Sequence, residues 1–135
     1  MRVDKPTAKS LLLAIIELGG YPNFLPLYQG LGCEVMIKSS MRKALALMRR
    51  RQPEIVVAEF NFQSDFRDRT SSLESLMAVA QRLARTRVIV FYEPEFDHHL
   101  DKLRSRFRFF RTLAFPVNED ELREAVREAI SGSAS

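Results

Sequence analysis

The sequence predicts a three-layer α/β domain, in which helices cover both faces of a doubly wound, five-stranded parallel sheet. Five short apolar runs rich in Val, Ile and Leu occur at regular spacing, and each is followed by a segment whose apolar residues have helical spacing. No internal repeat or low-complexity stretch interrupts this alternation. Strands that alternate with helices pair in parallel through right-handed crossovers, which places helices on both faces of one sheet.

The chain has the size of a single domain, because 135 residues with 46% hydrophobic content can bury one substantial core. We expect a flexible lead-in over residues 1–10, the domain over 11–131 and a flexible tail over 132–135. The only cysteine, Cys33, favours a reducing, cytoplasmic location. The apolar run at 11–16 is too short to span a membrane and lacks a cleavage pattern, so no membrane association is expected.

The first third of the chain predicts strand, helix, strand. Residues 11–18 form a continuous apolar run, which is typical of a strand covered on both faces. A short helix follows, with Asn23 as its expected N-cap and Pro26 in its first turn, where the missing N–H costs no hydrogen bond. Residues 33–39 alternate between apolar and polar side chains and predict the second strand.

The second helix and the central strand have clear boundary signals. Ser39 or Ser40 is the expected N-cap of a helix over residues 41–52. Residues 49–51 are all arginines at its end, where cations complement the helix dipole. Residues 53–60, PEIVVAEF, begin with proline and are rich in β-branched side chains, which predicts the third strand.

A polar loop is expected over residues 61–70, before the third helix. Ser71 and Glu74 have the spacing of a capping box at the start of that helix. Its apolar residues form one stripe, which consists of Leu73, Leu76, Met77, Ala80 and Leu83.

The last third of the chain repeats the alternation. Residues 87–92 predict the fourth strand, and residues 95–106 predict a helix with a thin apolar stripe. Residues 110–115 predict the fifth strand. Asn118 and Glu121 then have capping-box spacing at the start of the last helix.

Two stretches of the sequence resemble one particular family among those that share this fold. Residues 32–62 read GCEVMIKSSMRKALALMRRRQPEIVVAEFNF, which resembles the second strand, second helix and third strand of bacterial response-regulator receiver domains. Residues 115–130, FPVNEDELREAVREAI, resemble the end of such domains, where K-P-F precedes an acidic cap and an amphipathic helix. The resemblance covers residues 11–130. It implies the flavodoxin-like sheet order 2-1-3-4-5, with the site at the carboxyl ends of the strands.

The residues that carry receiver chemistry differ in this sequence. Receivers use an aspartate at the end of the third strand, an acidic pair after the first strand for Mg²⁺, a Ser or Thr ending the fourth strand and a Lys after the fifth, which together position a phosphoryl group. The matching positions here are Glu59, Glu17 alone, Tyr92 and Phe115. Glu59 is one methylene longer than aspartate, and Phe115 carries no charge.

These four departures predict a degenerate receiver that is not an enzyme and has neither catalytic residues nor a magnesium cofactor. We expect a phosphorylation-independent signalling and protein-interaction module of a bacterial two-component or phosphorelay system. Glu59 is interpreted either as a permanent mimic of the phosphorylated residue or as a carboxylate that simply faces water at a strand end. The alternative function is a phosphorylatable response regulator with unusual site chemistry.

A second candidate surface contains residues 104–111, RSRFRFFR, which interleave arginines with phenylalanines. In receivers the fourth helix, fifth strand and fifth helix form the usual partner or dimer face, so the resemblance implies a protein partner or a homodimer here. The alternatives are core packing and a stacking platform for single-stranded nucleic acid, which the net charge of +4 would favour. The interaction face is expected to consist of Phe96, Leu103, Phe107 and Phe109.

Overall fold

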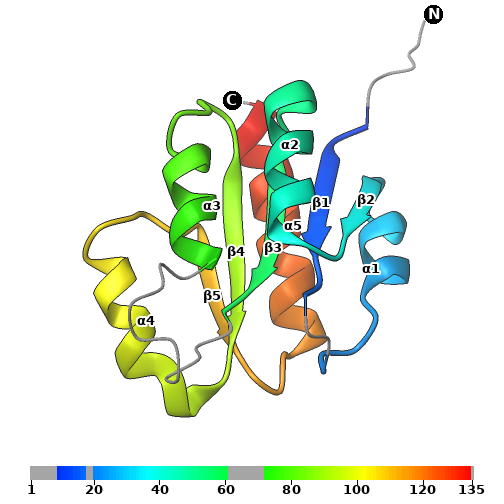
Figure 1. Cartoon of the computed structure of the whole chain (residues 1–135). Coiled ribbons are helices and arrows are strands. Elements are labelled where there is room, and N and C mark those ends of the chain that lie inside the picture. The colour runs from blue at the N-terminus through cyan, green and yellow to red at the C-terminus, as the bar shows by residue number, and fades with distance from the viewer. Residues whose placement is uncertain (1–8, 18–19, 61–71, 135) are drawn as a thin grey trace, which may run out of the picture.

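Five strands form one parallel sheet in the order β2-β1-β3-β4-β5 (Figure 1). The computed structural model describes residues 9–17, 20–60 and 72–134. The order confirms the predicted doubly wound α/β fold. The strands are β1 (Leu11–Ile15), β2 (Glu34–Lys38), β3 (Ile55–Glu59), β4 (Arg87–Tyr92) and β5 (Arg111–Ala114).

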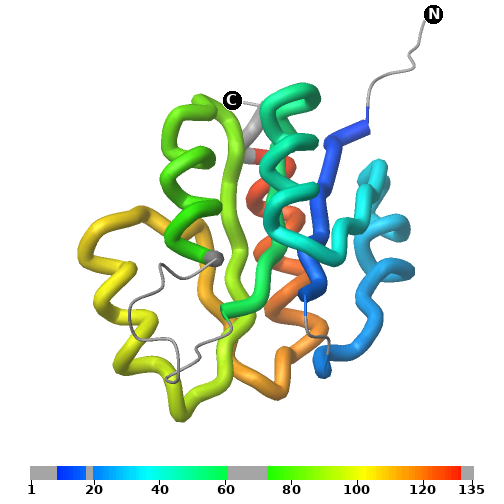
Figure 2. Tube along the Cα trace, in the orientation of Figure 1, coloured from blue at the N-terminus to red at the C-terminus, as the bar shows by residue number. Residues whose placement is uncertain are grey.

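Helices cover both faces of this sheet and complete the three layers (Figure 2). α2, α3 and α4 pack on one face, whereas α1 and α5 pack on the other. No helix within the described residues has the length and apolar character that a membrane span requires. The helices are α1 (Leu25–Gly30), α2 (Met41–Arg51), α3 (Ser72–Ala80), the 3-10 turn η1 (Pro94–Phe96), α4 (Asp97–Arg104) and α5 (Glu119–Ala134).

The three central strands are buried on both faces, which explains why their sequences show little alternation. Leu12 and Ile55 point into the layer with α1 and α5, and Leu13 and Val56 point into the layer with α2, α3 and α4. All four side chains are fully buried. Burial of each such side chain contributes about 1.5–3 kcal/mol, so these strands fix the positions of their own carboxyl ends.

The first strand and helix differ from their predicted bounds. β1 ends at Ile15, and Ile16, whose backbone N–H still donates to the Lys38 carbonyl of β2 at 2.9 Å, is 39% exposed. The N-cap of α1 is Phe24, so the prediction of Asn23 was wrong by one residue. The Asn23 Oδ1 accepts a hydrogen bond from the Leu25 N–H at 3.0 Å and closes the turn that leads into the helix.

The start of α2 confirms one of the two predicted caps. The Ser40 Oγ accepts a hydrogen bond from the Lys43 N–H at 3.2 Å, which satisfies a donor that has no partner inside the helix. Gln52 adopts a left-handed conformation, with φ of 43°, and ends the helix before Pro53.

The other helix ends combine confirmed and corrected predictions. The Asn118 Oδ1 accepts a hydrogen bond from the Glu121 N–H at 3.0 Å, as half of the predicted capping box requires. The predicted cap Ser71 and the loop over 61–70 lie outside the described residues. α4 ends at Arg104 instead of 106, and the backbone of α5 is helical through Ala134, whereas the last helix was expected within residues 115–130.

Candidate functional site

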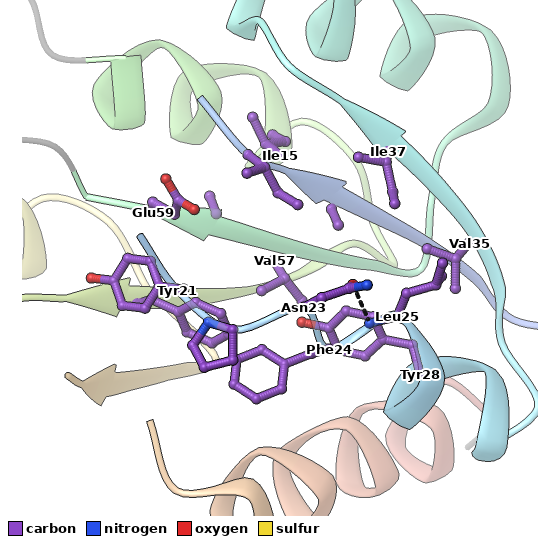
Figure 3. A pocket seen from close by; sticks show the side chains of 15 residues that line it. Ile15, Tyr21, Asn23, Phe24, Leu25, Tyr28, Val35, Ile37, Val57 and Glu59 are labelled. Carbon is purple, nitrogen blue, oxygen red and sulfur yellow. Dashed lines mark hydrogen bonds between the residues drawn. The ribbon is translucent and has the colours of Figure 1, made fainter. Parts of the chain in front are cut away.

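Glu59 is the last residue of β3 and is 6% exposed, so it does not face water as one interpretation of the sequence required. Ile55 and Val57 of the same strand pack into the layer with α1 and α5. Side chains alternate along a strand, so Glu59 is directed toward that same layer. Its partner in the β3–β4 register is Phe91, and it lines a small cavity there (Figure 3).

Aromatic rings surround this end of the sheet. The Tyr21 ring lies 5.2 Å from the Phe91 ring and 5.6 Å from the Phe115 ring, measured between centroids. The Phe24 ring lies 5.7 Å from the Phe91 ring, in an edge-to-face arrangement. We call these four residues the edge aromatic cluster. Tyr21 was missed in the sequence because it lies in a turn, although that turn follows the carboxyl end of a strand, where sites of open sheets form.

The pKa of the Tyr21 hydroxyl depends on the charges at this edge of the sheet. Burial, together with the nearby carboxylates of Glu93 and Glu59, raises the pKa of Tyr21 to about 12. The phenol therefore stays neutral at physiological pH. The charges that act on it are both negative, which is unlike the surroundings that stabilise a phosphoryl group.

The cavity beside Glu59 is small and mostly apolar. Its volume is about 30 Å³, which is enough for one or two water molecules. Ala14, Val57 and Tyr28 contribute to its walls, and Glu59 lies at one end (Figure 3). Pockets that bind nucleotides or sugars are roughly ten times larger.

Tyr92 faces the other side of the sheet from Glu59, where it packs against the layer with α2, α3 and α4. The Arg104 guanidinium lies over its ring, 5.4 Å from the centroid. That guanidinium also donates to the Asp97 and Asp101 carboxylates at 2.9 Å and to the Thr112 hydroxyl at 3.1 Å. Partial burial lowers the pKa of Arg104, but its hydrogen bonds, including one with Tyr92, outweigh burial and raise it. Tyr92 is thus engaged in a network away from Glu59.

The remaining two predicted site residues also lie at the carboxyl edge. Phe115 follows β5, is 38% exposed, and its backbone N–H donates to the Tyr92 carbonyl at 2.8 Å. Its peptide bond to Pro116 is cis. Glu17 follows β1 and is half-buried, but it is not among the residues that line the cavity with Glu59. The structure therefore brings Glu59 next to aromatic rings, with Phe115 at the position where the resemblance implies a lysine.

The predicted interaction face is largely occupied by the chain itself. Leu103 is a core residue with 7% exposure, which corrects its assignment to a docking face. Phe96, Phe107 and Phe109 are partly buried against the same core. Only part of each ring is available to a partner, so the packing alternative accounts for much of this pattern.

The chain's own cations lie over two rings of the Arg- and Phe-rich segment, those of Phe107 and Phe110. The Arg111 guanidinium lies 4.6 Å from the centroid of the Phe110 ring, and the Arg87 guanidinium lies 5.6 Å from it. Arg106 lies 5.0 Å from the Phe107 ring. Bases would have to displace these guanidinium groups in order to stack there.

Clusters of metal ligands and the Cys33 thiol are two further features that could support a reaction. Within residues 9–17, 20–60 and 72–134, no three His, Cys, Asp or Glu side chains gather as a metal site would require. Burial, and to a lesser degree the Glu54 carboxylate, raises the pKa of the Cys33 thiol. The thiol is therefore held in its less nucleophilic, protonated form.

Solved receiver domains have the same fold. The chain matches a response regulator receiver domain protein of Clostridium thermocellum with a TM-score of 0.74 and 19% identity, over 93% of this chain and 97% of that chain. It matches the signal receiver domain of an HD domain-containing protein from Pseudomonas fluorescens Pf-5 with a TM-score of 0.73 and 17% identity, over 94% and 98%. The chemotaxis protein CheY4 of Vibrio cholerae gives 0.65 and 17%, over 90% and 99%.

Comparisons at the level of sequence add nothing to this assignment. No protein-family model matches the chain, and no curated protein matches it. The chain has the fold of response-regulator receiver domains, and at these identities the likeness concerns the fold alone.

Proposed function

We propose that this chain is a receiver-fold signalling module of a bacterial two-component system that works in the cytoplasm without phosphorylation of Glu59. It acts by docking a protein partner or a second copy of itself, and it is not an enzyme. The observation that carries this proposal is the burial of Glu59 beside the edge aromatic cluster, where carboxylates are the charges that act on Tyr21. Signalling then depends on which surface the fold presents.

Electrostatics supports the loss of phosphotransfer. A phosphoryl group brings close to two negative charges at neutral pH, and a fixed cation or a metal must balance them. At this edge Phe115 offers an uncharged ring, and Glu93 adds a further negative charge near Tyr21. Burying a phosphoryl dianion among these aromatic rings would cost several kcal/mol unless a cation balanced it.

The same geometry argues against a magnesium cofactor. Mg²⁺ requires near-octahedral oxygen ligands and usually keeps several of its waters. The cavity that Glu59 lines has a volume of about 30 Å³ and mostly apolar walls. One buried carboxylate and space for one or two waters do not fit that coordination.

Phe96, Phe107 and Phe109 support docking of a protein at the α4–β5 side. All three are partly exposed, and Arg108, which is exposed, lies between Phe107 and Phe109 in the chain. Aromatic and arginine side chains are enriched in protein interfaces. Nucleic-acid stacking on residues 104–111 is the weaker alternative, because Arg87, Arg106 and Arg111 cover rings in this region.

The proposal is tested by incubating the full chain with acetyl phosphate and Mg²⁺ and measuring its intact mass. We expect no gain of about 80 Da, the increment of one phosphoryl group. A receiver domain with all of its phosphorylation residues serves as the positive control in the same buffer. A gain that Glu59→Gln abolishes, and that Glu95→Gln at an exposed position leaves intact, would establish the phosphorylatable alternative.

A further inference from the structure

A cluster of exposed cations lies on the face of the molecule that carries α2 and α3. Four of them project from α2, and two follow α3 in the turn that leads to β4. Within the described residues, none of the six is in an ion pair, and all six are exposed. We call this the basic surface, and it consists of Arg42, Lys43, Arg49, Arg50, Arg82 and Arg85.

Hydrogen bonds hold the two segments of the basic surface together. α2 and α3 pack side by side, and both end at the same end of the molecule, at the top in Figure 1. The Thr86 hydroxyl donates to the Pro53 carbonyl at 2.6 Å, and the Arg87 N–H donates to the Glu54 carbonyl at 2.9 Å. These bonds tie the turn that carries Arg85 to the turn that follows α2.

The acidic side chains in this region are already engaged. Glu34 binds Arg51 at 3.2 Å. The Glu54 carboxylate accepts a hydrogen bond from the Leu11 N–H at 3.0 Å, and Glu74 pairs with Arg106. Glu34 and Glu74 thus pair with arginines outside the basic surface, and the Glu54 carboxylate adds at most one negative charge against its six cations.

Helix stability explains only part of this cluster. Arg49 and Arg50 lie in the last turn of α2, where cations interact favourably with the helix dipole. Arg42 and Lys43 lie in the first turn, where the same dipole disfavours cations, and this turn contains no acidic residue. Cations at both ends of one helix are explained more simply by an external anion.

We propose that the basic surface binds the phosphate backbone of duplex nucleic acid. Five of its six members are arginines, whose planar forks match phosphate oxygens. Residues 42 and 49 lie on one stripe of the helix, about 10 Å apart along its axis, so they can contact separate phosphates. The recognition is electrostatic and independent of base sequence.

The side chains between the cations favour a duplex over other polyanionic partners. Ala46, Gln81 and Ala84 are exposed there and are small or polar. A membrane-binding surface would need an apolar face, and a protein interface would need an apolar or aromatic centre. Single strands are usually held by stacking on aromatic rings, which these positions do not supply.

The test is fluorescence anisotropy of a labelled duplex DNA of about 20 base pairs, a length of roughly two helical turns, titrated with the full chain. If about four phosphates are contacted, raising the salt from about 50 to 200 mM should weaken binding roughly 100-fold. Arg49→Gln with Arg50→Gln should lower the slope of log affinity against log salt by about 2. Arg49→Glu with Arg50→Glu should weaken binding at least tenfold.

The matched control is Lys102→Glu with Arg127→Glu, which makes the same change in net charge at exposed positions of α4 and α5, outside the basic surface. We expect this variant to bind within about twofold of the unchanged chain, and circular dichroism checks that every variant is folded. Equal losses in both charge-reversal variants, or no binding to the duplex at low salt, would overturn the proposal. Binding to polyglutamate or to phosphatidylserine vesicles without binding to the duplex would do the same.

Discussion

Tyr21 is the residue that most changes the interpretation of the site. Its ring contacts Phe91 and Phe115, and its pKa responds to Glu59 and Glu93. These contacts join the turn after β1 to the ends of β3, β4 and β5. A strand end that resembles a phosphorylation site is thereby part of a packed aromatic cluster.

The ionisation of this single residue, Tyr21, gives a testable prediction. Its pKa is raised from 10 to about 12, first by burial and then by Glu93 and Glu59. We expect Glu93→Gln to lower the pKa of Tyr21, because one of the two negative charges is removed. The measurement is the tyrosinate absorbance near 295 nm during alkaline titration, with Tyr21→Phe used to assign the signal.

The same shift fixes the sign of a change in stability. A folded-state pKa above the unfolded value contributes stability that is present below pH 10 and is lost as the pH rises toward 12. The free energy of unfolding of the unchanged chain should therefore fall more steeply above pH 10 than that of Tyr21→Phe. For the pKa measurement, Glu95→Gln at an exposed position is the control. If Glu93→Gln and Glu95→Gln changed the pKa of Tyr21 equally, the role assigned to Glu93 would be contradicted.

Individual elements were predictable from sequence wherever local signals decide them. Ser40 and Asn118 were identified as caps because their spacing to the helix is a local property. The early end of β1 and the start of α1 at Leu25 depend on where the chain meets its neighbours, which periodicity does not contain. Leu103 has helical spacing whether a core or a partner covers it, so only the fold could place it.

The N-cap of α2 gives a testable prediction about the stability of the protein. Ser40→Ala removes the acceptor for the Lys43 N–H and should lower the free energy of unfolding by about 1 kcal/mol. Ser39→Ala is the control, because the neighbouring Ser39 is exposed and Ser40 is the N-cap. Urea denaturation followed by circular dichroism measures both. Equal losses for the two variants would mean that the cap is not the source of the effect.

The candidate site was only partly predictable. The resemblance placed Glu59, Tyr92 and Phe115 at one edge of the sheet, where the structure has them. The resemblance did not predict that the Glu59 and Tyr92 side chains point to opposite faces of the sheet. It also did not predict that the Arg104 guanidinium lies over the Tyr92 ring. Those facts arise from strand alternation and from side chains that are distant in the sequence.

At the scale of the whole molecule, the fold of receiver domains is retained while two parts of its surface carry unusual chemistry. The carboxyl edge holds a buried Glu59 among aromatic rings, near the negative charge of Glu93. The face with α2 and α3 carries the unbalanced cations of the basic surface. We therefore expect the domain to keep one conformation, whether or not a phosphodonor is present.

The most direct test of this single conformation is a titration of the ¹⁵N-labelled chain with beryllofluoride and Mg²⁺, which together mimic a phosphorylated carboxylate. The amide chemical shifts are measured at each step of the titration. We expect no saturable shifts at Glu59, Phe91 or Tyr92. Saturable shifts at the carboxyl ends of β3 and β4 that spread to α4 and β5 would contradict it, because they would show that Glu59 still responds as a phosphorylation site.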